Sequence, residues 1–208
     1  IRSKRKGAQQ ILGTLSQAIF IAMFGDPVTN PKKWPIATLG ELAEFLDSRR
    51  KPITAVDRVP GPIPYYGANG KQDSVADFIF DEPLLLLAED GGHFDQPERG
   101  VAYVIEGKSW VNNHAHVIRP KDEVTLHFLC ESIRTRDLTS FVTGSTRAKL
   151  TKAKAMRIPI AVPPIDLQIE YSKSILQIGN LKATSTVAAE IEEELFLSLS
   201  TNAFRGAL

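Results

Sequence analysis

The chain has 208 residues, of which 43% are hydrophobic and 24% are charged, with a formal net charge of +1. This composition is ordinary for a globular domain, and it excludes a disordered chain, a collagen-like repeat and a bundle of membrane-spanning helices, because no apolar run approaches the roughly 20 residues that a span needs. The one cysteine, Cys130, lies in an apolar helical pattern and is expected to be a reduced, buried thiol of a cytoplasmic protein.

The first half of the chain predicts one amphipathic helix followed by largely irregular backbone. Apolar residues of 9–24 recur at spacings of three and four, which line one helix face, and Gly25-Asp26-Pro27 ends the pattern. After it we expect a proline-punctuated loop at 26–35, short elements at 39–46, irregular backbone at 52–72 because of its prolines and glycines, and a strand at 78–80.

The second half predicts strands and then helices. The expected elements are a buried strand at 84–88, a turn at 89–92, a β-hairpin of 101–105 with 110–118, a helix at 125–133 and a short apolar segment at 156–162. From 165 to 204, apolar residues four or seven apart predict a helix of about 60 Å that needs a partner helix. Weak helix formers at 179–186 could bend or break it.

The two ends of the chain resemble each other. Leu12-x-x-Leu15-Ser16-x-x-x-Phe20 recurs as Phe196-x-x-Leu199-Ser200-x-x-x-Phe204. Chance similarity between two amphipathic helices is one explanation. The other is that 27–208 is one unit of a tandem repeat and 1–26 the tail of a preceding unit, which a start without methionine inside a helix would fit.

The sequence carries little catalytic chemistry. GxGxxG, GxxxxGK[ST] and GxSxG patterns are all missing. His114-x-His116 on one strand would place both rings on one face, as a metal site requires, but no third ligand follows at a recognisable spacing. Asp90 with Glu106-x-Lys108 imitates the acid-acid-lysine set of metal-dependent nucleases, although Glu-Gly-Lys is also an ordinary hairpin turn.

Residues suited to nucleic-acid recognition are more abundant. Residues 77–106 hold eight acids and one base, whereas 134–157 hold seven bases and one acid, so a neutral total can conceal a basic face; such runs are also typical of solvated surfaces. Asn and Gln side chains pair with adenine, and cations pair with guanine or phosphate. The residues expected to read bases are Asn69, Lys71, Gln72, Asn112, Asn113 and His114, and those expected at phosphates are Arg147, Lys149, Lys152 and Lys154. Tyr65, His116, Ser145 and Thr146 are also expected to contact the DNA.

Two alternatives to these roles stay open. Tyr65 and Trp110 are more often core residues than stacking platforms, and Asn112 and Asn113 could satisfy backbone groups in a bulge.

An ordered set of segments resembles type I restriction-modification DNA specificity subunits. The resemblance covers nearly the whole chain as one target-recognition half. Its segments are Phe24 to Pro27 with Trp34 and Leu39 to Glu41, Ile63 to Gly70, Leu87 to Gly92, Trp110 to Val117, Gly144 to Thr146 with Leu150, Ile158 to Ile165 with Gln168, and Ala203 to Gly206.

The resemblance implies a non-catalytic subunit that binds duplex DNA. Family members carry two recognition domains separated by long helices, and each domain reads half of a split site. The helices dock methyltransferase subunits, which bind S-adenosylmethionine, and a separate restriction and translocase subunit uses ATP and magnesium, so no cofactor is expected in this chain. With one recognition domain, the chain is either an excised half or a half-length subunit that dimerises, and a two-fold dimer would read a palindromic split site.

These observations predict an α+β fold with three parts. Residues 1–26 would be a helix, 27–162 a β-rich target-recognition domain, and 163–208 a spacer helix that forms an antiparallel coil with a helical partner. The rivals from other classes are a metal-dependent nuclease using Asp90, Glu106 and Lys108, and a helical scaffold that never contacts DNA.

Overall fold

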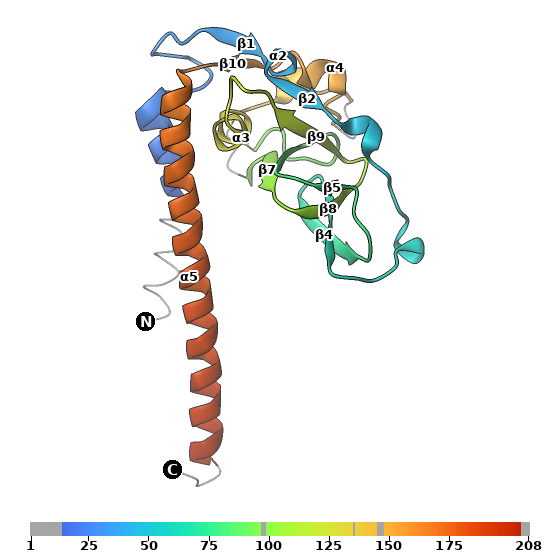
Figure 1. Cartoon of the computed structure of the whole chain (residues 1–208), viewed down its shortest axis with the longest axis vertical. Helices are drawn as coiled ribbons and strands as arrows, with labels where there is room; N and C mark the ends of the chain where they lie inside the picture. The colour runs from blue at the N-terminus through green and yellow to red at the C-terminus, as the bar shows by residue number, and fades with distance from the viewer. Residues whose placement is uncertain (1–13, 97–98, 135, 145–147, 205–208) are drawn as a thin grey trace. The chain divides into compact units, whose positions relative to one another are not determined.

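The computed structural model describes residues 14–96, 99–134, 136–144 and 148–204 (Figure 1). The chain divides into two compact units, one of Ile1–Ile19 with Lys173–Leu208 and one of Phe20–Ser172. The second unit combines three sheets with short helices, so the predicted α+β class is confirmed.

The elements follow one another along the described residues. In order they are a helix at 14–24, β1 (Ile36–Thr38), α2 (Leu39–Leu42), β2 (Ala43–Phe45), the 3-10 turns η1 (Asp47–Arg49) and η2 (Ala55–Asp57), β3 (Ile63–Gly67), β4 (Gly70–Val75), β5 (Phe80–Asp81), β6 (Leu84–Ala88), β7 (Ala102–Ile105), β8 (Lys108–Val111), β9 (Ala115–Pro120), α3 (Leu126–Arg134), η4 (Thr139–Phe141), α4 (Lys152–Ala155), β10 (Pro159–Ala161) and α5 (Ile165–Phe204).

Strand β6 is the centre of the larger unit. All five of its residues are fully buried, as expected of a continuous apolar strand with both faces covered. It lies between β7 and β9 in a sheet of order β2-β9-β6-β7, and α3 packs against the same sheet. The predictions of a buried strand at 84–88 and a helix near 125–133 are confirmed. Cys130 of α3 is buried, and burial raises the pKa of its thiol to about 12.

The predicted hairpin of 101–105 with 110–118 is wrong. Strand β7 pairs with β6, whereas β8 lies in a second sheet of order β4-β3-β8-β5. The expected strand at 110–118 is two strands in two sheets, separated at 112–114. The break has a local cause, because the Asn112 carboxamide oxygen accepts the His114 backbone N–H at 2.8 Å and closes a turn.

The expectation of irregular backbone throughout 52–72 is also wrong. Its second half is the antiparallel pair β3–β4, which turns at Ala68–Asn69. Gly70, with φ +108, ends the turn in a conformation that glycine adopts without strain. Only the segment before β3 is irregular, with η2 at its centre.

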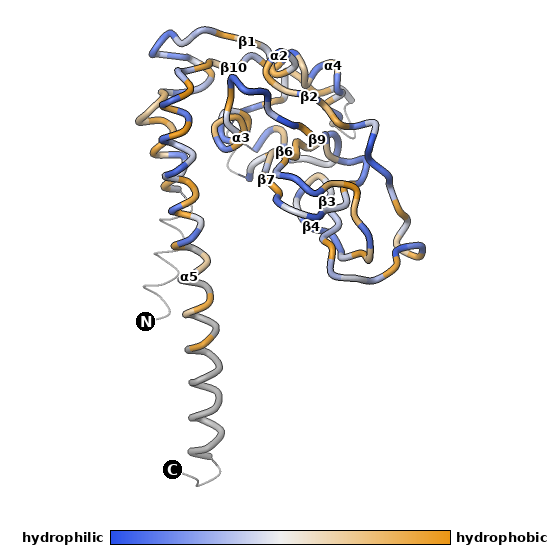
Figure 2. The backbone as a smooth tube through the Cα atoms, viewed as in Figure 1, coloured by the Kyte–Doolittle hydropathy of each residue, from blue (hydrophilic) through white to orange (hydrophobic). Residues whose placement is uncertain are grey.

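Both predicted helices at the ends of the chain are present within the described residues. The helix at 14–24 contributes Phe20 and Phe24 to an aromatic cluster with Phe128 of α3 and Tyr171 of α5, with ring centroids 5.0–5.6 Å apart. Helix α5 runs unbroken through 179–186, and hydrophobic and hydrophilic residues alternate along its coloured part (Figure 2). No helix of the described residues has an apolar stretch able to cross a membrane. Leu12 and the side chains of 196–204 lie outside the described set, so the end-to-end repeat stays a prediction.

Candidate nucleic-acid interface

A groove of about 330 Å³ opens where three segments of the larger unit meet. The loop before β3 supplies Pro52, Ile53, Thr54 and Arg58, the β3–β4 pair supplies Tyr65 and Gln72, and the turn between β8 and β9 supplies Asn112, Asn113 and His114. We call these nine residues the groove. Four of the residues predicted to read bases, which are far apart in the sequence, therefore line one concavity.

The turn at 112–114 is held by Asn112. The residue is 3% exposed, its Nδ2 donates to Gln72 Oε1 at 3.0 Å, and its backbone N–H donates to the Tyr66 carbonyl at 3.0 Å. The amide of Asn112 is therefore buried and bonded within the protein, which does not support the prediction that Asn112 reads a base. Asn112 instead fixes the positions of the exposed Gln72 and Asn113.

Two more predicted contacts are corrected by burial. Tyr65 is 1% exposed, accepts the Ile53 backbone N–H at 3.2 Å and carries the Arg58 guanidinium 4.3 Å above its ring centroid, so it supports an arginine instead of stacking on a base. His116 is fully buried and cannot reach a ligand either. Asn69 and Lys71 are exposed on the β3–β4 pair but do not line the groove.

His114 and Asp90 form a pair at the edge of the groove. The ring Nδ1 lies 2.6 Å from Asp90 Oδ1, and a carboxylate only accepts, so Nδ1 carries the hydrogen. The His114 side chain is 37% exposed, whereas that of Asp90 is 14% exposed. Asp90 thus orients an exposed imidazole.

The basic segment adjoins this edge through Lys149. Lys149 and Asp90 form an isolated antiparallel bridge, and Lys149 Nζ lies 3.0 Å from Glu89 Oε1 while its side chain remains 49% exposed. Lys152 lies over the Phe45 ring at 5.7 Å, and Lys154 donates to the Val142 carbonyl at 3.3 Å. Ser145, Thr146 and Arg147 lie outside the described residues.

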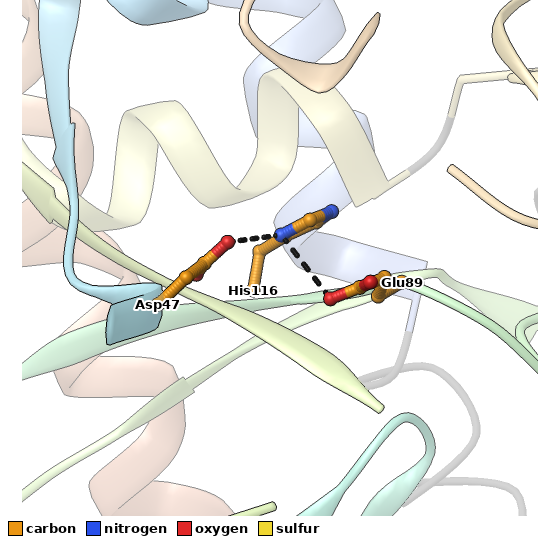
Figure 3. A group of neighbouring side chains, drawn as sticks. All are labelled: Asp47, Glu89 and His116. Carbon is orange, nitrogen blue, oxygen red and sulfur yellow. Dashed lines mark hydrogen bonds and ion pairs between the residues drawn. The ribbon is translucent and has the colours of Figure 1, made fainter. Parts of the chain in front are cut away.

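A mostly buried ion cluster of Asp47, Arg50, Glu89 and His116 adjoins the turn at 112–114 through the Arg50 hydrogen bond to the Asn113 carbonyl. Figure 3 shows three of its members, Asp47, Glu89 and His116. His116 Nδ1 is 2.7 Å from Asp47 Oδ2 and its Nε2 is 2.8 Å from the Leu150 carbonyl. The Leu150 carbonyl and an ionised Asp47 both accept hydrogen bonds, so each ring nitrogen faces an acceptor. Arg50 donates to Glu89 at 2.7 Å and to the Ala115 carbonyl at 2.7 Å.

The pKa values of the two carboxyls agree with this arrangement. Burial by itself would raise the pKa of Asp47, but the His116 hydrogen bond and charge, the Val117 N–H and the Arg50 charge outweigh burial and hold that pKa below its usual 3.8. Burial opposes ionisation of Glu89 in the same way, and Arg50 and Lys149 together lower its pKa below 4.5.

The ligand atoms of Asp47, Glu89 and His116 lie within 4.8 Å of one another, which is close enough to consider a metal ion. The donors do not fit one. An ion would have to replace the hydrogen on His116 Nδ1 and displace Arg50 from Glu89, in a cluster whose carboxylates already have Arg50, His116 and Lys149 as counter-charges. The His114–His116 pair, which the sequence offered only as a weak metal candidate, does not converge on one point either, because each ring bonds a different carboxylate.

The nuclease set is not assembled. Ile105 pairs with Leu84 at one end of β6, so Glu106 and Lys108 follow that end, whereas Asp90 follows the other end. At the usual rise of a strand, Asp90 and Glu106 are roughly 20 Å apart. No divalent ion can bridge that distance.

Arginines of the proline-rich loop are the functional candidates that sequence reasoning missed. Arg58 lines the groove, and Arg50 joins the ion cluster to the Asn113 and Ala115 carbonyls beneath the turn. The available signal was a pair of cations flanking a proline-punctuated segment just before Tyr65.

A β-rich domain that presents amide, imidazole and cationic side chains in one open groove has the features of a nucleic-acid recognition domain. Comparison with known proteins refines this class. Residues 31–193 match the model of the type I restriction modification DNA specificity domain. Over 135 residues the chain is 39% identical to a Haemophilus influenzae protein named as a type I restriction enzyme specificity subunit, S.HindORF215P, covering 65% of this chain and 34% of that protein.

Solved structures show the same fold at low sequence identity. A chain from a study of complex assembly and conformational transition of the type I R-M system aligns with all of this chain and 55% of its own, at TM-score 0.62 and 18% identity. The HsdS subunit of Thermoanaerobacter tengcongensis aligns with all of this chain and 54% of its own, at TM-score 0.51 and 19% identity. The S subunit from M. genitalium aligns with 91% of this chain and 52% of its own, at TM-score 0.51 and 19% identity.

The chain therefore belongs to the family of type I restriction-modification DNA specificity domains, as its segments predicted. It spans about a third of the curated relative and about half of the solved chains.

Proposed function

We propose that the chain reads one half of a split duplex target through the groove and that it carries out no catalysis itself. The observation that supports this most is the gathering of Gln72, Asn113 and His114 in one concavity, next to a lysine on a separate segment. Amide groups discriminate bases by paired hydrogen bonds, and an exposed lysine neutralises phosphate, so the surface combines the two kinds of contact that specific binding requires.

The long helix suits a role in assembly. Leu176, Leu181, Val187 and Ile191 of α5 are 50–60% exposed, which is more apolar surface than a helix in water usually presents. We assign this helix to contacts with methyltransferase subunits and with a second recognition half or a second copy of the chain. S-adenosylmethionine, ATP and magnesium would then be bound by the methyltransferase and the restriction and translocase subunits.

Selection from a random duplex pool tests the recognition role. The purified chain is incubated with 30-base-pair duplexes of random sequence, and bound duplexes are amplified and sequenced. An enriched motif is the expected result, whereas retention of the pool without any preference would contradict the proposal.

Asn113→Ala separates base reading from general affinity. We expect it to weaken binding of the selected duplex by about 1–3 kcal/mol and to leave binding of the random pool unchanged, because only the selected bases match the amide. Fluorescence anisotropy titrations of both duplexes measure the two affinities. Equal loss on both would remove Asn113 from base reading.

Lys149→Ala tests the phosphate contact. Binding to both duplexes should weaken, and the slope of log K against log salt should fall by about one unit, because one fewer counterion is released. Lys121→Ala, at an exposed lysine after β9, is the matched control and should leave the slope unchanged. An unchanged slope for Lys149→Ala would exclude it from the interface.

A further inference from the structure

The two walls of the groove carry different chemistry. One wall holds amides and an imidazole from β4 and the turn after β8, whereas the loop wall holds a single charged residue, Arg58. Arg58 lies inside the 31–193 family match but in none of the segments that carry the sequence resemblance, and its place in the groove follows from how the loop before β3 folds back over Tyr65.

Arg58 is held in one orientation by three contacts. Its Nε–H donates to the Ile53 carbonyl at 3.2 Å, its NH1 donates to Asp73 Oδ2 at 2.8 Å, and its guanidinium lies 4.3 Å from the Tyr65 ring centroid. Tyr65 is itself fixed, because it is buried and bonded to Ile53. The plane of the guanidinium is therefore set before any ligand arrives, which lowers the entropic cost of a directed contact.

Two of the five N–H donors of Arg58 are used in these bonds. The remaining donors match the two acceptors, O6 and N7, that guanine presents in the major groove. A phosphate fits less well, since it would approach the Asp73 carboxylate, which bonds the same guanidinium and is 44% exposed. A neutral base edge does not meet this repulsion.

We infer that Arg58 is a specificity-determining residue that reads a guanine in the groove, with Asp73 and Tyr65 as the residues that position it. This inference rests on the proposed DNA recognition and predicts that one base of the DNA target is a guanine. Gln72 and Asn113, on the other wall, would contact neighbouring base pairs.

The test repeats the duplex selection with Arg58→Ala, Arg58→Lys and Asp73→Asn beside the unmodified chain. The expected result is that Arg58→Ala erases a guanine preference at one position of the enriched motif, with roughly 10- to 100-fold weaker binding of the selected duplex and unchanged binding of the random pool. Arg58→Lys should not restore the preference, because an ammonium cannot make the paired contact. Asp73→Asn keeps the arginine but loosens it, and should weaken the preference without erasing it.

Several results would overturn the inference, and they differ from failure of the proposed function. Equal weakening on both duplexes with rescue by Arg58→Lys would make Arg58 a phosphate contact, and an unchanged motif would remove it from recognition. If the unmodified chain enriches no motif, the proposed function fails first, and the inference with it. Arg157→Ala, at an exposed arginine before β10, controls for loss of positive charge, and thermal melting of each variant confirms that it is folded.

Discussion

Arg50 and Arg58 lie eight residues apart and each holds a carboxylate at nearly the same distance, yet their surroundings differ. The Arg50–Glu89 pair is 2.7 Å long with side chains 12% and 13% exposed, whereas the Arg58–Asp73 pair is 2.8 Å long with side chains 19% and 44% exposed. Distance alone does not separate a pair that supports the fold from one that holds an arginine at an open surface. Burial does, because a buried charge that loses its partner cannot be rehydrated.

The largest expected effect comes from breaking the buried pair. Arg50→Ala should lower the free energy of unfolding by about 2–3 kcal/mol, because it removes the 2.7 Å partner of Glu89 and a second cation beside Asp47, and leaves the two mostly buried carboxylates with Lys149 and His116 alone. Arg58→Ala should cost about 1 kcal/mol or less, since Asp73 is open to water. Urea denaturation of both variants measures the difference. Equal losses of unfolding free energy would show that burial does not distinguish the contributions of the two pairs to stability.

Acid should lower the free energy of unfolding by protonating Asp47 and Glu89 of the buried cluster, with a smaller effect than Arg50→Ala. Asp47 and Glu89 have pKa values below their usual 3.8 and 4.5, so the unfolded chain binds protons at them before the folded chain does. Their contribution is complete above these usual values and is lost as pH falls through the lower, folded values. Unfolding free energies measured from pH 6 to pH 2 should decline in this window, and the decline should be shallower in Arg50→Ala. The same slope in both proteins would contradict the role of the cluster.

Gly67→Ala alters the groove and not the cluster. A Cβ at Gly67 would overlap the side-chain amide of Gln72, which is exposed but would have to leave its hydrogen bond with the buried Asn112. We expect about tenfold weaker binding of the selected duplex, with the unfolding free energy lowered by about 1 kcal/mol. Gly179→Ala in α5, where an added Cβ meets no atom within 4 Å, is the control and should leave binding unchanged. Unchanged binding by Gly67→Ala would mean that the position of Gln72 does not matter.

The sequence predicted the parts of this molecule that depend on local pattern. The sequence predicted strand β6 from a run of consecutive apolar residues and helix α3 from apolar residues at a 3.6-residue period, and both signals come from residues close together in the chain. The break between β8 and β9 was not found, because it depends on one side chain, Asn112, that turns back to a backbone N–H and to Gln72, 40 residues away.

The candidate site was predicted in part for the same reason. Polar side chains at 72 and 112–114 signalled recognition by their type, but Asn112 and His116 are used inside the protein, and type alone does not reveal burial. Arg50 and Arg58 were missed because their partners Glu89, Ala115 and Asp73 are 15–65 residues away along the chain. Which sheet a strand joins and which carboxylate a cation pairs with both depend on the tertiary structure.

Photo-crosslinking to a duplex of the selected sequence tests the central claim most directly. Thymines along the duplex are replaced with 5-iodouracil, and the attached peptides are mapped by mass spectrometry. The groove as the DNA-facing surface predicts crosslinks within 52–58, 71–73 and 112–114. Crosslinks confined to the β1–β10 pair, with none in those three segments, would contradict it.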